Sequence, residues 1–219
     1  ILIVSALQTW AIHAQQGGYN LESIADSLKQ NAYSIVQEYN AYVNIHSKEE
    51  GEAQFRQVIT VLDEKGKRDA DFVYFADKFR TFDGFKGELL DASGKRVMTL
   101  KKSDLKSSSI SDGLASDDKT YFYNCTYEKY PYTIVYEWDM KYKYGFLAFP
   151  NFIPVTSFNQ SLVNAQYTLV IPKDMDIDYR MSAGTDKPTI KKEEKSDTYQ
   201  WKWESICANE HERFGPSLM

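Results

Sequence analysis

Apolar and polar residues alternate with a period of two over most of the chain after residue 32, and this pattern predicts a series of β-strands. The alternating segments are rich in aromatic and β-branched residues, which favour strands. Clusters of Asp, Gly, Lys and Pro separate them and predict turns. The predicted strands cover residues 33–43, 53–62, 72–75, 85–91, 95–99, 121–127, 132–142, 161–171, 177–181 and 197–204.

The alternation also predicts local details within this series of strands. In the first strand it places Ile35, Gln37 and Tyr39 on one face. The strands on either side of residues 92–94 are expected to form a hairpin. Residues 63–66 end in glycine and are predicted to form a hairpin-style turn.

A helical pattern occurs near the N-terminus, between Asn20 and Ala32. Asn20 can cap this helix, because its side chain can accept a hydrogen bond from the first turn. Apolar residues recur there with the spacing of one helix face at Leu21, Ile24, Ala25, Leu28 and Ala32. About ten strands, one short helix and no alternation of strands with helices together predict an all-β protein. We expect an antiparallel β-sandwich, immunoglobulin-like in outline, with one short N-terminal helix.

Three segments lack regular alternation. Residues 101–119 are polar and rich in serine, which predicts a long exposed loop. Residues 146–158 contain Pro150 and Pro154, which prevent regular strand pairing. Residues 185–196 are charged and are predicted to form a turn. None of these segments is a clear domain boundary, so residues 20–205 are predicted to form a single sandwich domain.

The two ends of the chain differ from this domain. Residues 1–14 are apolar, carry no Asp, Glu, Lys or Arg, and are too few to span a bilayer, which takes about 20 residues. They resemble the core of a secretory signal peptide that lacks its basic start, with cleavage expected after Ala14. The alternative is an ordinary buried helix or strand. Residues 15–19 would then form a leader, and residues 206–219 a linker-like tail toward a further domain. The protein is therefore predicted to be exported to the periplasm or the cell surface, without a transmembrane segment.

Composition narrows the classes of function. The 219 residues include 42% hydrophobic residues, which is enough for a packed core. A formal charge of −5 disfavours nonspecific nucleic-acid binding. Three histidines leave few ligands for a transition metal, and no phosphate-binding loop or hydrolase motif occurs. We therefore expect no enzyme, no cofactor and no catalytic, cofactor-binding or metal-binding residues.

One acidic segment has part of a calcium-binding pattern. Asp174, Asp176 and Asp178 have the alternate spacing of the first ligands in a calcium loop. Such a loop needs glycine and glutamate at later positions, where this chain has Tyr179 and Thr185. A plain solvated turn is the favoured interpretation.

The two cysteines, Cys125 and Cys207, allow one disulfide in an exported protein. In the chain-entropy model a bridge around a loop of about 80 residues contributes roughly 4 kcal/mol. The alternative is two separate thiols that act as small hydrophobic groups. No local signature supports a cysteine hydrolase.

Aromatic residues are the other candidate for chemistry. Tyr199, Trp201 and Trp203 alternate along one predicted strand and share a face, where they could stack against sugar rings. The competing interpretation is a buried core face, since large aromatic side chains dominate cores. A second aromatic row, Tyr142, Tyr144 and Phe146, is a further candidate for binding glycans.

The order of these features resembles an uncharacterised β-sandwich domain that precedes transglutaminase-like domains in exported bacterial proteins. The resemblance extends from about residue 20 to the C-terminus and rests on hydrophobic patterns and turns that occur in the same order. The corresponding segments read QVITVLDEKGKRDA, FKGELLDASGKRV, TIVYEWDM, FIPVTSFNQSLVNAQYTLVIPKDMDIDYR and YQWKWESICANEHERFGPSLM.

This resemblance implies a non-catalytic accessory module. The catalytic Cys-His-Asp triad of such proteins lies in the following domain, so no residue of this chain inherits that role. The implied partner is a transglutaminase-like domain of the same polypeptide, on which this module packs or to which it presents substrate. The alternative function is a carbohydrate- or peptidoglycan-binding module, and an envelope protein or glycan would then be the partner.

Overall fold

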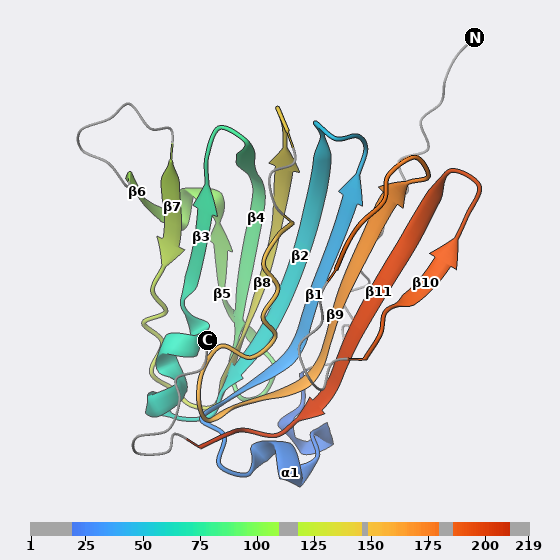
Figure 1. Cartoon of the computed structure of the whole chain (residues 1–219). Helices are drawn as coiled ribbons and strands as arrows, with labels where there is room; N and C mark the ends of the chain where they lie inside the picture. The colour runs from blue at the N-terminus through green and yellow to red at the C-terminus, as the bar shows by residue number, and fades with distance from the viewer. Residues whose placement is uncertain (1–18, 110–117, 146–148, 180–185, 211–219) are drawn as a thin grey trace.

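The computed structural model describes residues 19–109, 118–145, 149–179 and 186–210. The predicted signal peptide at residues 1–14 lies outside these ranges, as do residues 15–18 of the leader and residues 211–219 of the tail. Within them, strands form a large eight-stranded sheet and a small three-stranded sheet (Figure 1). The prediction of a mostly β protein is therefore confirmed.

The large sheet has the strand order β10-β11-β9-β1-β2-β8-β4-β5, and the small sheet has the order β3-β7-β6. The strands of the large sheet are β1 (Ser34–Ile45), β2 (Gly51–Val61), β4 (Arg80–Leu90), β5 (Arg96–Lys101), β8 (Tyr132–Tyr142), β9 (Gln160–Pro172), β10 (Thr189–Lys192) and β11 (Ser196–Ile206). Those of the small sheet are β3 (Phe72–Ala76), β6 (Lys106–Ser109) and β7 (Lys119–Tyr123).

One strand pair contradicts the prediction of an antiparallel fold, because β1 and β9 run parallel. Strand β8 also runs in the direction of β1, because β8 is antiparallel to β2 and β2 is antiparallel to β1. Thus β8 and β9 point the same way, and the chain must return along the sheet between them. Residues 149–158 of this return pass over one face of the large sheet (Figure 1). We call residues 149–158 the return segment.

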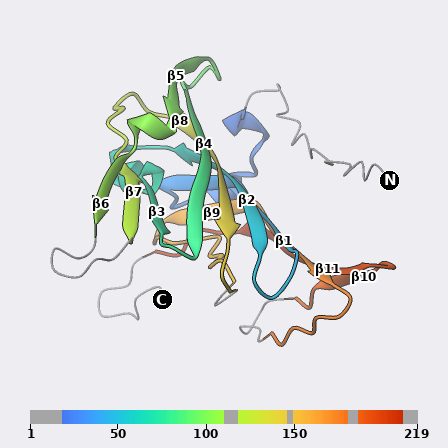
Figure 2. The same ribbon diagram turned by 90° about the horizontal axis from the view of Figure 1, so that it is seen from above.

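The small sheet covers only part of the large one. The large sheet curves around it (Figure 2), and the two sheets meet through aromatic rings. Phe72 on β3 packs against Tyr136 and Trp138 on β8, with ring centroids 5.2 and 5.3 Å apart. Further along the same face, the return segment covers the large sheet in place of the small sheet. Its Phe152 stacks on Tyr39, with ring centroids 4.4 Å apart. The immunoglobulin-like outline is not confirmed, because the large sheet is covered partly by the small sheet and partly by the return segment.

A register shift in β1 corrects the predicted face of the first strand. The pairing with β2 shifts between Val36 and Glu38, which indicates a β-bulge. Because a one-residue shift exchanges the two faces, Ile35 and Tyr39 pack in different hydrophobic clusters. The prediction that Ile35 and Tyr39 share a face was therefore wrong.

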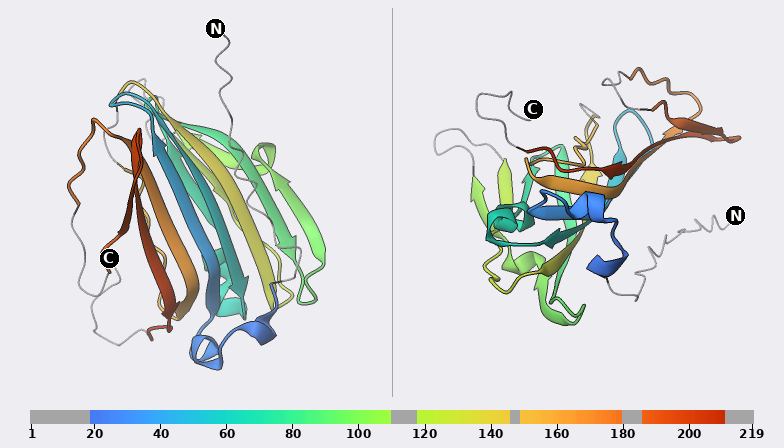
Figure 3. Two further views of the ribbon diagram at one scale, coloured as in Figure 1. Left: turned by 90° about the vertical axis from the view of Figure 1, so that its right-hand side faces the viewer. Right: turned by 90° about the horizontal axis from the view of Figure 1, so that it is seen from below.

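The N-terminal helix is shorter than predicted and consists of η1 (Leu21–Ser23) and α1 (Asp26–Lys29). The Asn20 cap is confirmed, since its Oδ1 accepts a hydrogen bond from the backbone N–H of Glu22 at 3.0 Å. Below the end of the sheet (Figure 3, left), this segment buries Ile24 and Leu28 against Ile35. No helix in the described ranges has the length and apolarity needed to cross a membrane.

Some of the predicted turns and loops are confirmed by the structure, and others are wrong. The predicted hairpin around residues 92–94 is confirmed as the β4–β5 connection. The predicted turn at residues 63–66 was wrong, because Asp63 caps a longer 3-10 helix there, η2 (Glu64–Ala70). Two segments expected to be loops contain strands, namely β6 and β10, whose residues are all exposed. Residues 177–179 of the predicted strand 177–181 are not a strand, and residues 180–181 lie outside the described ranges.

Candidate binding site

The predicted aromatic row lies on β11 and faces the interior side of the large sheet. Opposite it on β9, Trp201 pairs with Tyr167 and Trp203 with Ala165, both of which are buried. The rings of Tyr199 and Trp201 stack, with centroids 6.1 Å apart and planes 18° apart. All three aromatic residues of the row are half-buried. The row thus contributes to the core and keeps part of its surface open.

Segments on either side frame this row. Phe152 of the return segment lies 5.4 Å from Trp203, measured between ring centroids. Tyr179, which follows β9, contacts Trp201 at 5.6 Å in an edge-to-face arrangement. Tyr179 remains 38% exposed. The aromatic surface that a ligand could reach therefore includes Tyr179 beside the predicted residues.

The second predicted row is not brought together. Tyr142 ends β8 and is buried, whereas Tyr144 is 78% exposed in the turn that follows. The reason is that the strand ends at Tyr142, and Tyr144 adopts a left-handed backbone conformation with φ of 63°. Phe146 lies outside the described residues. Tyr142 and Tyr144 therefore do not form a common binding surface.

The two cysteines are free thiols in the structure, which matches the alternative of two separate thiols and not the possible disulfide. Cys125 is buried after β7, where its backbone N–H donates to Asp71 Oδ1 at 2.9 Å. Cys207 is exposed just beyond β11. The two thus follow strands of different sheets and differ in exposure to solvent.

The acidic segment after β9 remains a turn. Asp174 and Asp178 are exposed, and Met175 donates its backbone N–H to the carbonyl of Pro172. In the ranges that the structure describes, no group of three or more His, Cys, Asp or Glu side chains is placed to hold a metal ion.

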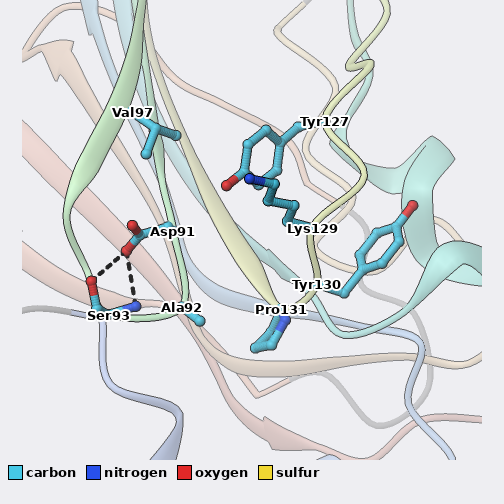
Figure 4. Close-up of a pocket in the computed structure, with 8 residues that line it drawn as sticks. All are labelled: Asp91, Ala92, Ser93, Val97, Tyr127, Lys129, Tyr130 and Pro131. Carbon is cyan, nitrogen blue, oxygen red and sulfur yellow. Dashed lines mark hydrogen bonds between the residues drawn. The ribbon is translucent and has the colours of Figure 1, made fainter.

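A cavity of about 410 Å³ lies between the β4–β5 hairpin and the segment before β8 (Figure 4). This volume lies within the range of small-ligand pockets. No motif in the sequence marks it. Its lining residues are Asp91, Ala92, Ser93, Val97, Tyr127, Lys129, Tyr130 and Pro131. In Figure 4 the side chains of Tyr127 and Lys129 project from their segment toward the hairpin.

Asp91 organises the hairpin side of the cavity. Its Oδ1 accepts hydrogen bonds from the Ser93 hydroxyl at 2.6 Å and from the backbone N–H groups of Ser93 and Lys95. The Ser93 hydroxyl, followed by these backbone donors, holds the pKa of Asp91 below its usual range. Asp91 is therefore ionised at neutral pH and serves mainly to fix the turn.

The opposite side of the cavity is a connecting segment held by its own contacts. The hydroxyl of Tyr130 is buried and has no hydrogen-bond partner among the described residues. Its ring packs against that of Tyr132 at 5.6 Å. Lys129 is exposed. The cavity thus joins one cation and several aromatic or apolar surfaces to a rigid turn.

The chain belongs to the family described as a "Domain of Unknown Function with solved-structure structure" (DUF3857), whose model matches residues 47–209. No curated protein matches the sequence.

Among solved structures, a protein named "putative protease" from Parabacteroides distasonis is similar in fold, with a TM-score of 0.66 and 11% identity. The alignment covers 85% of this chain and 38% of that protein, so this chain spans well under half of its length. That identity supports a common fold and nothing about activity.

Two further structures are more distant. An M1 zinc metallopeptidase from Deinococcus radiodurans has a TM-score of 0.33 and 8% identity over 77% of this chain and 38% of that one. A "putative nutrient binding protein" from Legionella pneumophila has a TM-score of 0.39 and 8% identity over 82% and 68%. These two likenesses carry no inference.

Proposed function

We propose that this chain is a non-catalytic accessory domain of a longer, exported bacterial protein. In this role it packs on a transglutaminase-like catalytic domain of the same polypeptide, or presents substrate to it. The observation that carries the proposal is the fold shared with the protein named "putative protease", because the aligned region makes up 38% of that protein. A fold that occupies a minor part of a larger protein fits a supporting role. The resemblance in sequence order supplies the transglutaminase-like partner.

The test has two steps. The gene is sequenced beyond the codon for Met219, and the catalytic activities of two proteins are then compared. The first is the complete product, and the second is residues 15–219 alone. We expect the complete product to catalyse amide hydrolysis or acyl transfer, through a Cys-His-Asp set outside this chain, and the shorter protein to show none. Activity of the shorter protein, or a gene that encodes no further domain, would contradict the proposal.

The aromatic row on β11 supports a second candidate function, binding of carbohydrate or peptidoglycan. The specific observation is that Tyr199 and Trp201 present nearly parallel rings, flanked by the partly exposed Tyr179. Parallel, half-exposed rings on a rigid strand can stack against the apolar faces of sugars.

This second function predicts a fluorescence response. Titration with soluble peptidoglycan fragments is expected to change the tryptophan emission with saturation, because Trp201 would lose contact with water on stacking. Trp201→Ala is expected to weaken binding about tenfold, as central aromatic residues dominate such contacts. Tyr144→Ala is the control, since Tyr144 is exposed but lies outside the row. A titration without any change in emission would exclude glycan binding at this row.

A further inference from the structure

The cavity of Figure 4 adjoins an unpaired edge of the large sheet. Strand β5 is the last strand in the sheet order, so only its β4 side is paired within the described part of the chain. Its outer side presents backbone N–H and C=O groups at alternate residues. Val97 belongs both to this edge strand and to the cavity lining. A ligand in the cavity can therefore reach the free backbone of β5.

The surface of β5 combines features of a protected edge with exposed apolar side chains. Natural edge strands are commonly blunted by charge, by proline, by a β-bulge or by short length. Strand β5 has two of these features, because Arg96 and Lys101 stand at its ends and its pairing with β4 shifts at Val97. Between these end charges, Val97 is 45% exposed and Met98 is 36% exposed. The strand thus offers two partly exposed apolar side chains next to an unpaired backbone.

The charge around this edge is opposite to that of the whole protein. Residues 86–106 contain six Lys or Arg and three Asp or Glu, a local formal charge of +3 in a chain of −5. The three carboxylates have partners: Glu88 binds Lys86 and Arg96, Asp91 holds its turn, and Asp104 accepts from the N–H of Lys101. Across the cavity, Lys129 adds a further exposed cation. The surroundings therefore favour an anionic ligand.

We propose that β5 and the adjoining cavity bind an extended acidic polypeptide segment, which adds as an edge strand to the large sheet. Its backbone pairs with the free side of β5, at the usual strand spacing of about 4.8 Å. Alternate apolar side chains of the ligand lie beside Val97 and Tyr127, and its carboxylates meet Lys129 and the basic flanks of β5. This inference goes beyond the accessory role, because it concerns a different surface and holds whether or not a catalytic domain follows.

The test measures fluorescence anisotropy of labelled peptides added to the full chain. The probe is EVEFEVE, whose valine and phenylalanine side chains share one face when it is extended. KVKFKVK keeps the apolar face and reverses the charge. We expect saturable binding of EVEFEVE and binding of KVKFKVK that is weaker by about tenfold or more. Methylation of the backbone nitrogens on one edge of EVEFEVE should abolish binding, while methylation on the other edge should not.

Matched variants locate the site on the protein. Val97→Glu and Lys129→Glu are each expected to weaken EVEFEVE binding about tenfold. Their controls lie on the opposite edge strand: Ile190→Glu, where the native side chain is 44% exposed, and Lys192→Glu. These controls should bind within about twofold of the unchanged chain. All four positions are exposed, and circular dichroism confirms folding.

Three results would overturn the proposal. The first is no saturable binding of EVEFEVE, and the second is equal weakening by the β10 controls. The third is a dimer in light scattering that Val97→Glu dissociates, because a second copy of the chain would then occupy this edge. None of these results bears on whether a catalytic domain follows, so this proposal and the accessory role fail separately.

Discussion

Replacing Phe72 by alanine is expected to lower the free energy of unfolding by about 4 kcal/mol, within the range for buried phenylalanine. Phe72 is 4% exposed and is the main aromatic contact between the small and large sheets. Its ring centroid lies 4.8 Å from Phe85, 5.2 Å from Tyr136 and 5.3 Å from Trp138. Truncation removes these contacts and leaves a cavity at the junction of the sheets.

Urea unfolding monitored by tryptophan fluorescence measures this loss, because Trp138 is one of the rings that Phe72 contacts. The control is Val73→Ala on the same strand, where the native side chain is 65% exposed. This control should change the free energy of unfolding by no more than about 0.5 kcal/mol. If Phe72→Ala cost less than about 1.5 kcal/mol, the small sheet would have to be held mainly by other contacts.

The hydrophobic alternation of the sequence predicts where strands lie but not how they pair. Alternation located β8 at residues 132–142 and nearly all of β9, because each strand buries one regular face. The same pattern says nothing about which strand pairs with which, or in which direction. The parallel pairing of β1 with β9 requires the return segment to cross the sheet. The position of that segment is shown by the stacking of Phe152 on Tyr39, a contact between residues far apart in sequence.

Exposed elements and the cavity were missed for related reasons. Strand β6 has the sequence KSSS and buries none of its residues, so no hydrophobic pattern marks it. The predicted turn at residues 63–66 is the start of the helix η2, and its Gly66 lies so close to the chain that an added Cβ would be 2.2 Å from the carbonyl oxygen of Tyr33. The cavity joins Asp91 and Lys129, which are far apart in sequence and carry no common motif. The aromatic row, in contrast, lies on a single strand, so alternation alone could place its three rings on one face.

The opposite face of the large sheet contains a buried charge that packing arguments do not explain. Arg56 lies on β2 and its side chain is only 5% exposed. It bonds to Glu137 directly across on β8 and to the hydroxyl of Tyr19, and its Nε lies 3.4 Å from Glu38 on β1. Burial acts to lower the pKa of Arg56, but Tyr19, Glu38 and Glu137 outweigh it and raise that pKa. The guanidinium therefore stays charged and joins three strands.

Arg56→Met is expected to lower the free energy of unfolding by about 3 kcal/mol, because it leaves two carboxylates without their shared cation. The side chains of Glu38 and Glu137 are 23% and 35% exposed, so water offsets part of the loss and the estimate stays at the lower end. The second variant, Arg56→Met with Glu38→Leu and Glu137→Leu, removes all three charges. It is expected to recover at least about half of the loss, since burial of the unpaired charges is what costs stability.

Urea unfolding at neutral pH compares both variants with Lys67→Met, which breaks the exposed pair of Lys67 with Glu128 and should leave the midpoint unchanged. If the triple variant were no more stable than Arg56→Met, the unpaired carboxylates of Glu38 and Glu137 would not lower the free energy of unfolding. Arg56 would then stabilise the fold through packing of its alkyl chain and its bond to Tyr19. A single variant within about 1 kcal/mol of the unchanged chain would mean that water replaces the guanidinium between the strands. The expected loss of unfolding free energy is near zero for Lys67→Met, intermediate for the triple variant and largest for Arg56→Met. This order follows the extent to which each variant leaves a charge that is both buried and unpaired.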